Sequence, residues 1–288
     1  MSLRENALNI YTSCLEKLEP RKRVYDYLSS LKTSIVDCDK IFPVAFGKAA
    51  FSMMDGLMTY LKSINSIDKI HNLPIVISNS KSVPDYPISE FIAAHPTPDE
   101  NSVLAAKSVL KYTSEINAHD LSINLISGGG SSLLCLPHDD ISLNDKVLVN
   151  NLLLKCGASI NEINTIRKHL SKIKGGRLSE HVYPSKSISL IISDVINDDI
   201  STIASGPTSI DHTTYGDAID IIHRYKIEKE IPENVMDLLR RGKSGQVSES
   251  PKNLDNTDNH IICRNKIFRK ELIQAANKLG FSSFLIDR

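Results

Sequence analysis

Five short apolar segments, separated by segments with helical periodicity, constrain the fold more than any other feature of this sequence. They span residues 40–47, 72–78, 91–95, 121–128 and 187–195. Long apolar runs with little polar alternation are expected for strands that are buried on both faces, as in a parallel sheet. The segments between them place apolar residues three and four positions apart, which is typical of helices. The order therefore predicts an α/β fold with a largely parallel, doubly wound sheet and helices on both faces.

A polar segment near the C-terminus indicates a boundary. Residues 240–260 are rich in Ser, Asn, Asp and Gly, as expected of a linker or a long surface loop. We predict an N-terminal Rossmann-like α/β domain over residues 1–245 and the beginning of a second, truncated α/β domain over residues 256–288. The second unit has a strand, helix and strand pattern. It is too small to cover its own sheet, so it either docks on the first domain or continues into further chain.

Composition narrows the class of partner. The 34 basic residues balance the 34 acidic ones, without a long run of one sign, which argues against nucleic acid and against an anionic membrane. No apolar segment reaches the roughly 20 residues of a membrane helix. The five cysteines are scattered and form no CxxC pair, which favours the reducing cytoplasm. A small molecule or a second copy of the chain, as in a homodimer, is the expected partner.

Ligands of open α/β sheets bind beyond the carboxyl ends of the strands, so the residues that follow each strand are the first candidates for a site. After the first strand, Gly47 precedes Lys48, a cation in the first helical turn that opposes the helix dipole unless an anion lies between them. An anionic ligand is one interpretation, and a solvated side chain is the other. After the third strand, His95 is interpreted as structural or substrate-orienting rather than catalytic.

The fourth strand opens into the loop SGGGSS. Consecutive N–H groups and two hydroxyls could bind a phosphate or a carboxylate, although a glycine-rich turn also serves packing alone. The loop consists of Ser127, Gly128, Gly129, Gly130, Ser131 and Ser132. It matches neither common nucleotide fingerprint, because Leu133 stands at the last glycine of GxGxxG and Ala49 at the Ser or Thr of a P-loop.

The fifth strand ends in carboxylates. Asp194 closes the strand, and Asp198 and Asp199 follow within one turn. Such a group suits a Mg²⁺ site or a base that accepts a proton from a hydroxyl, so all three are candidate metal ligands. Helix capping is the ordinary alternative for Asp198 and Asp199. The turn ASGPT, which contains Gly206, could return N–H groups to the same site.

A basic helix precedes the fifth strand. Ser159 begins a capping-box pattern, which predicts a helix that continues to the glycine pair at 175–176. Its cations include Arg167 and Lys168. They either face solvent or hold phosphate near the glycine pair.

Five motifs, taken together in this order and spacing, resemble the class II glycerate 2-kinase family, some of whose members were earlier labelled hydroxypyruvate reductases. The motifs are FGKAAFSMM, AAHPTPDENSVLAA, LISGGGSSLLCLP, INEINTIRKHLSKIKGGRLS and ISDVINDDISTIASGPTSID. The resemblance covers residues 8–287. It implies a transferase that uses ATP and Mg²⁺ to phosphorylate D-glycerate at its 2-hydroxyl, in a cleft between two α/β domains.

The resemblance also implies roles for individual residues. Lys48 and Asp194 become catalytic, and the loop 127–132 becomes the anion-binding surface. Arg167 and Lys168 become cleft residues that bind substrate or phosphate. Asn197 departs from the family pattern, which usually has Gly there, and Asn tolerates the left-handed conformation better than most residues.

Two alternatives to the kinase stay open, and the first follows from a second departure from the family pattern. Family members continue into a full second domain, so the chain could be a catalytically silent ligand-binding fragment that lacks the C-terminal half. Hydroxypyruvate reduction is the other alternative, and the missing dinucleotide fingerprint argues against it.

Overall fold

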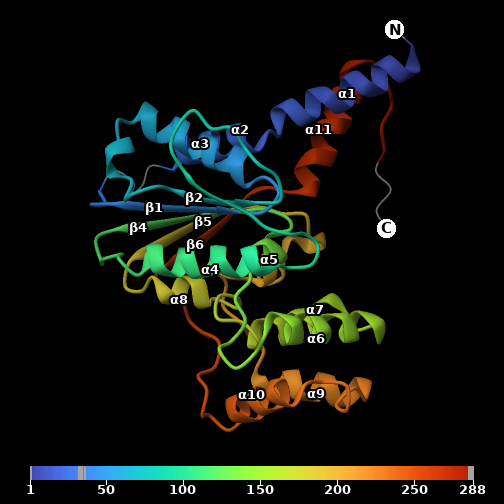
Figure 1. Ribbon diagram of the computed structural model, residues 1–288. Helices are drawn as coiled ribbons and strands as arrows, with labels where there is room; N and C mark the ends of the chain where they lie inside the picture. Colours follow the sequence, from blue (N-terminus) through green and yellow to red (C-terminus); the bar gives the residue numbers. More distant parts are fainter. Residues whose placement is uncertain (1, 32–34, 36, 285–288) are drawn as a thin grey trace.

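The centre of the molecule is a six-stranded sheet in the order β3-β2-β1-β4-β5-β6, with all neighbouring strands parallel. The structure, a computed structural model, describes residues 2–31, 35 and 37–284 (Figure 1). The strands are β1 (Ile41–Phe46), β2 (Ile75–Ser78), β3 (Ser89–Ile92), β4 (Leu121–Ile126), β5 (Lys186–Ile192) and β6 (Thr257–Cys263). The prediction of a parallel α/β sheet is confirmed, and the strand order reverses between β1 and β4.

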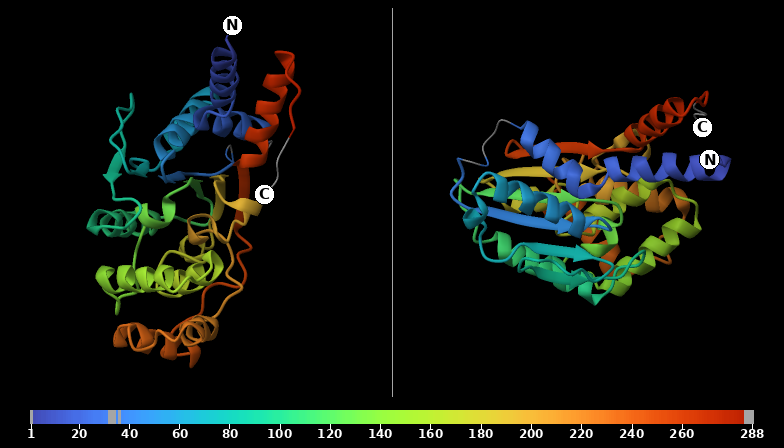
Figure 2. Two further views of the ribbon diagram at one scale, coloured as in Figure 1. Left: turned by 90° about the vertical axis from the view of Figure 1, so that its right-hand side faces the viewer. Right: turned by 90° about the horizontal axis from the view of Figure 1, so that it is seen from above.

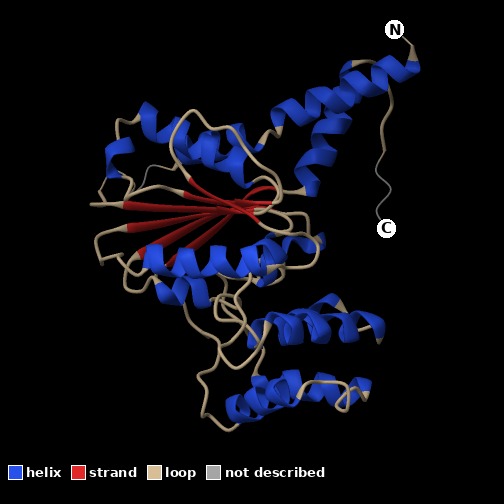
Figure 3. Ribbon diagram, viewed as in Figure 1, coloured by secondary structure: helices blue, strands red, loops and turns tan. Residues whose placement is uncertain are grey.

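Helices cover both faces of the sheet, as Figures 1 and 3 show. The covering helices are α2 (Pro20–Ser30) and α3 (Ala50–Ser63) on one face, and α4 (Glu100–Thr113), α5 (Gly130–Leu133) and α8 (Arg177–His181) on the other. A third group lies beyond the second face and consists of α6 (Leu143–Lys155), α7 (Ile160–His169), α9 (Tyr215–Tyr225) and α10 (Glu233–Lys243). Short 3₁₀ turns are η1 (Ile67–Lys69), η2 (Ile196–Asp198) and η3 (Ile203–Ser205).

Two helices from opposite ends of the chain extend away from the sheet together. They are α1 (Leu3–Lys17) and α11 (Asn265–Lys278), which lie side by side in both views of Figure 2. Lys17 forms an ion pair with Glu271 at 3.0 Å, and the rings of Tyr11 and Phe268 meet edge to face. Among the described residues, none of the helices combines the length and hydropathy of a membrane span.

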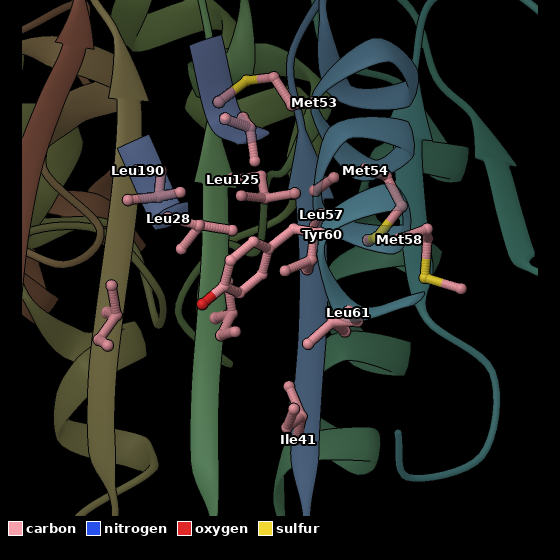
Figure 4. Packing of buried hydrophobic residues seen from close by; sticks show 14 of the residues in the cluster. Leu28, Ile41, Met53, Met54, Leu57, Met58, Tyr60, Leu61, Leu125 and Leu190 are labelled. Atoms are coloured by element: carbon pink, nitrogen blue, oxygen red, sulfur yellow. The ribbon is translucent and has the colours of Figure 1, made fainter. Parts of the chain in front are cut away.

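Burial on both faces explains the unbroken apolar runs in the strands. In β1, Ile41 and Ala45 belong to the cluster under α2 and α3, whereas Val44 and Phe46 belong to the cluster on the opposite face. Figure 4 shows side chains of α3 such as Leu57 directed toward the strands. Each fully buried side chain of this size contributes about 1.5–3 kcal/mol to folding. The third group of helices has an apolar cluster of its own.

The segment 240–260 is held against the body of the protein along much of its length. Its first residues lie in α10, and its last residues lie in β6, beside β5. Between them, Ser250 is only 2% exposed and donates a hydrogen bond to Asp211 at 3.0 Å. Residues 281–284 form no strand, and the rest of the predicted last strand, 285–288, lies outside the described residues. The division into two domains stays a prediction.

The helix α7 begins as predicted and ends earlier than predicted. Ser159 caps it and forms the capping box. The helix ends at His169, however, and not at the glycine pair 175–176. After α7 the N–H group of Lys172 donates to the carbonyl of Leu136 at 3.0 Å, which is incompatible with continued helical hydrogen bonding.

Candidate active site

Three strand ends that carry candidate residues meet where the strand order reverses. Lys48 follows β1, the loop 127–132 follows β4, and Asp194 follows β5. Ligands of doubly wound sheets bind at this point, because the loops on its two sides diverge and leave a crevice. The N–H group of Lys48 donates to the carbonyl of Gly128 at 2.9 Å, which joins the first two loops directly.

Close approaches explain why glycine occupies two positions of these loops. A Cβ atom at Gly47 would lie 2.5 Å from the carbonyl oxygen of Ser127, and its φ of +124° is one that other residues rarely adopt. A Cβ atom at Gly128 would lie 2.9 Å from the carboxyl carbon of Asp194 and nearer still to one carboxylate oxygen. The loop after β4 therefore touches the other two loops.

The side chains of Lys48, His95 and Asp194 surround the middle of this loop. A Cβ atom at Gly129 would lie 2.9 Å from the ring of His95 and 3.4 Å from Cγ of Lys48. Partial burial, and then the charge of Lys48, lower the pKa of His95, while the charge of Asp194 opposes the shift. The side chains of Lys48 and Asp194 form no hydrogen bond or ion pair with the described residues, so both are available to a ligand.

The predicted metal ligands have different surroundings. Asp198 lies 3.4 Å from Nη1 of Arg264. Asp199 accepts hydrogen bonds from Ser201 and Thr202, so its carboxylate is engaged within its own turn. Burial alone would raise the pKa of Asp199, but these hydrogen bonds outweigh burial and lower it. No group of three or more His, Cys, Asp or Glu suited to a metal occurs within the described ranges. Of the three predicted ligands, Asp194 has the only carboxylate without a partner in the described part of the chain.

The turn that contains Gly206 supports the loop after β4. The N–H group of Gly206 donates within the turn, to the carbonyl of Ile203 at 2.9 Å, so it is not directed at a ligand. Its neighbour Ser205 lies 2.9 Å from Ser131, hydroxyl to hydroxyl, and donates to Asn164 at 3.0 Å. This turn therefore holds the second half of the loop against α7.

Arg167 and Lys168 point in different directions from α7. Lys168 is buried and forms an ion pair with the buried Asp211 at 3.2 Å, so it stabilises the junction between α7 and the segment before α9. The guanidinium of Arg167 contacts two amide oxygens instead. It lies 2.8 and 2.5 Å from Asn150 and 3.3 Å from Asn164. Arg167 lines a cavity, whereas Lys168 does not line it.

Comparison with known proteins identifies the family of this chain. Residues 6–240 match the family described as "Domain of unknown function (DUF4147)". The chain belongs to the DUF4147 family. Over 99% of its length it is 36% identical to "Glycerate 2-kinase" of Pyrococcus horikoshii and 36% identical to "D-glycerate 2-kinase" of Thermotoga maritima. This DUF4147 chain spans 65% and 64% of the length of those two relatives.

A solved structure supports the same relationship. The crystal structure of glycerate kinase from Thermotoga maritima matches 97% of this DUF4147 chain with a TM-score of 0.84 and 35% identity. The chain covers 63% of that structure. The resemblance to glycerate 2-kinases, predicted from five motifs, is confirmed.

The cavity beside the loop 127–132 of this DUF4147 chain has a volume of about 250 Å³. It is lined by residues from the loop and the segment after β3 on one side, and by residues from α6, α7 and the turn after α7 on the other. The polar residues and the glycine of the lining are His95, Thr97, Gly129, Ser131, Ser132, Lys146, Asn150, Asn151, Arg167 and Lys174. Lys146 is a site residue that no motif marks. The sequence does contain an indication of it, because Lys146 lies on the face of α6 that also buries Val149 and Leu153, where a lysine is unusual.

Proposed function

We propose that this protein catalyses the ATP-dependent phosphorylation of D-glycerate to 2-phosphoglycerate. One observation carries the proposal. Lys48, the loop 127–132 and Asp194 lie together at the switch point of the sheet, and both charged side chains are exposed without a partner in the described part of the chain. The names of the relatives point to the same reaction. The cytoplasm as the compartment and a homodimer as the assembly stay predictions from the sequence.

The arrangement supplies what phosphoryl transfer requires of a protein, which is mainly positioning and charge stabilisation. Lys48 stabilises the negative charge on the transferred phosphoryl group. Asp194 accepts the proton of the 2-hydroxyl as its oxygen bonds to phosphorus and the bond from phosphorus to ADP breaks. The loop lies against both residues.

The residues of the site offer Mg²⁺ one carboxylate ligand. The carboxylate of Asp194 is the available ligand, and Mg²⁺ usually takes only one or two protein carboxylates, with waters and phosphate oxygens completing its shell. When bound, Mg²⁺ would neutralise charge on the nucleotide phosphates. Proton acceptance and metal binding are alternative roles for Asp194, and both place it beside the reacting hydroxyl.

A coupled assay for ADP formation with D-glycerate, ATP and Mg²⁺ tests the proposal. We expect product to form, and the Lys48→Ala and Asp194→Asn variants to lose most turnover while their melting temperatures stay near that of the unsubstituted protein, because both side chains are exposed. Absence of ADP above background would refute the kinase. A rise in melting temperature with D-glycerate or nucleotide but no product would instead support the silent ligand-binding alternative, which the relatives do not favour.

A further inference from the structure

The cavity beside the loop 127–132 is rich in positive charge. Its lining includes Lys146, Arg167 and Lys174, as well as His95, and it includes no Asp or Glu among the described residues. Lys146 is 6% exposed and Lys174 is 1% exposed. None of these three basic side chains forms an ion pair with a carboxylate in the part of the chain that the structure describes. Buried cations without a counter-ion are unfavourable, so the arrangement favours an anion in the cavity.

Lys174 has a structural role at the floor of this cavity. Its Nζ donates to the carbonyl and hydroxyl oxygens of Ser131 at 2.7 and 3.1 Å, with the carbonyls of Leu134 and Ala204 at 3.5 Å. These four acceptors outnumber the three N–H groups of an ammonium, so none of the three is left over. Burial, and then the charge of Lys146, lower its pKa well below the ordinary value, so the positive charge of the cavity rests mainly on Lys146 and Arg167. Lys174 therefore holds the loop and has no donor left for a ligand.

Lys146 and Arg167 retain donors. Nζ of Lys146 contacts a single partner, the thiol of Cys135 at 2.9 Å, which leaves two N–H groups. The guanidinium of Arg167 has five N–H groups and uses three of them on the amide oxygens of Asn150 and Asn164. A planar guanidinium beside an ammonium is well suited to a carboxylate or a phosphate.

The size and position of the cavity favour a small acid over a nucleotide. Its volume of about 250 Å³ is below the range of roughly 300–1,000 Å³ for pockets that enclose larger ligands. One end is lined by Gly129 and His95. Lys48 lies next to Gly129, and the charges of Lys48 and Asp194 both act on His95. A short hydroxy acid could thus place its carboxylate inside the cavity and its hydroxyl near Asp194.

We propose that this cavity is the acceptor subsite, in which Lys146 and Arg167 bind the carboxylate of a small hydroxy acid and direct its hydroxyl toward Asp194. The proposal rests on the proposed kinase function for the identity of the acid. Nucleotide then binds outside the cavity, on the side of Lys48. His95 closes the end of the cavity where the hydroxyl lies.

Calorimetric titration of the 288-residue chain with D-glycerate tests this assignment, because every named ligand-binding side chain lies within this chain. We expect Lys146→Met and Arg167→Gln to raise the Kd for D-glycerate about tenfold to a hundredfold, as for loss of a hydrogen bond to a charged group. Lys155→Met is the matched control, since it removes the same charge from an exposed position of the same helix. We expect it to leave the Kd unchanged. If Arg167→Gln does not fold, Arg167→Lys replaces it. This variant keeps the charge but loses the planar guanidinium, so the Kd for D-glycerate should still rise.

Three further probes, which are glycerol, inorganic phosphate and a non-hydrolysable ATP analogue, test whether the cavity recognises the carboxylate of D-glycerate. Glycerol, which lacks the carboxylate, should not bind. If inorganic phosphate or a non-hydrolysable ATP analogue depends on Lys146 and Arg167 while D-glycerate does not, the cavity is a phosphate site and the proposal is wrong. Absence of D-glycerate binding would overturn it as well.

The binding experiment tests the subsite separately from the kinase activity. Binding of D-glycerate that depends on Lys146 and Arg167, without formation of ADP, would support the subsite and refute the kinase. Conversely, kinase activity whose KM for D-glycerate is unchanged in both variants would refute the subsite and leave the kinase in place. A KM for ATP that stays constant while that for D-glycerate rises is the expected result.

Discussion

The Gly128→Ala substitution tests the contact between the loop after β4 and Asp194. Gly128 has no positive φ, so its backbone accepts alanine, and the new Cβ atom would lie 2.9 Å from the carboxyl carbon of Asp194. Ordinary contacts of a Cβ atom lie beyond 3.4 Å, and Oδ2 of Asp194 is nearer to the new atom than the carboxyl carbon is, so the carboxylate has to retreat by about 1 Å. Misplacement of a catalytic group by this distance costs about 10²-fold in rate. We therefore expect kcat for D-glycerate phosphorylation to fall about a hundredfold.

The cost in stability should be small. The carboxylate of Asp194 is exposed and can turn into solvent, and replacement of Gly by Ala also reduces the entropy of the unfolded chain. We expect a change of less than ~1 kcal/mol in the free energy of unfolding, which corresponds to a few degrees in melting temperature at most. Gly216→Ala in α9 is the control. Its nearest atom, Oγ1 of Thr214, lies at an acceptable 3.4 Å, and activity should be unchanged.

A double-mutant cycle decides whether the effect passes through Asp194. In the Asp194→Ala background the new methyl group meets no carboxylate, so adding Gly128→Ala should lower kcat little further. Full turnover by the Gly128→Ala variant would refute the reasoning. A loss of equal size in the Asp194→Ala background would refute it too, because the methyl group would then act on something other than the carboxylate.

Three further results are expected. Gly47→Ala should lower the free energy of unfolding by more than about 1 kcal/mol in urea denaturation, since the methyl group meets a backbone carbonyl and the φ is +124°; unchanged stability would contradict the close approach. Asp211→Ala should cost about 3–5 kcal/mol, because it leaves Lys168 buried without a partner, whereas the double change with Lys168→Met should cost less. Burial raises the pKa of Glu249, but hydrogen bonds from His169 and two N–H groups outweigh it and lower the pKa to about 2. Its stabilisation is therefore present above the ordinary value of 4.5 and disappears as the pH falls toward 2, so Glu249→Gln should flatten that part of the pH–stability curve.

The features predicted well from sequence are those that short stretches of chain determine. The apolar runs of β1, β4 and β5 and the residues that follow them are local patterns, and the parallel sheet brings their ends together without further information. The capping box of α7 is equally local. For this reason the sequence alone predicts that Lys48, the loop 127–132 and Asp194 belong to one site.

Features that depend on distant partners were not predicted. The helix α7 ends before the glycine pair because the following residues turn toward the loop 127–132, where Lys174 contacts Ser131, a residue more than 40 positions away. Nothing near Lys174 in the sequence shows that contact. Similarly, the polar segment 240–260 lies against the protein because Ser250 reaches Asp211, 39 positions away. Hydrogen bonds from side chains to distant backbone or side-chain groups therefore outweigh the structure that local composition predicts.

The neighbours Arg167 and Lys168 show why a balanced charge does not exclude a charged site. Consecutive residues on a helix do not face the same way, so the two cations of α7 meet different surroundings although the sequence placed them in one cluster. Lys168 meets Asp211 and is neutralised, whereas Arg167 meets amide oxygens and keeps its charge beside Lys146. The chain has equal numbers of acidic and basic residues, but no Asp or Glu of the described residues lines the cavity, and some acids, such as Asp211, pair with cations elsewhere. Folding thus concentrates positive charge at the cavity by distributing the counter-ions to other places, and a neutral chain acquires a site for a small anion.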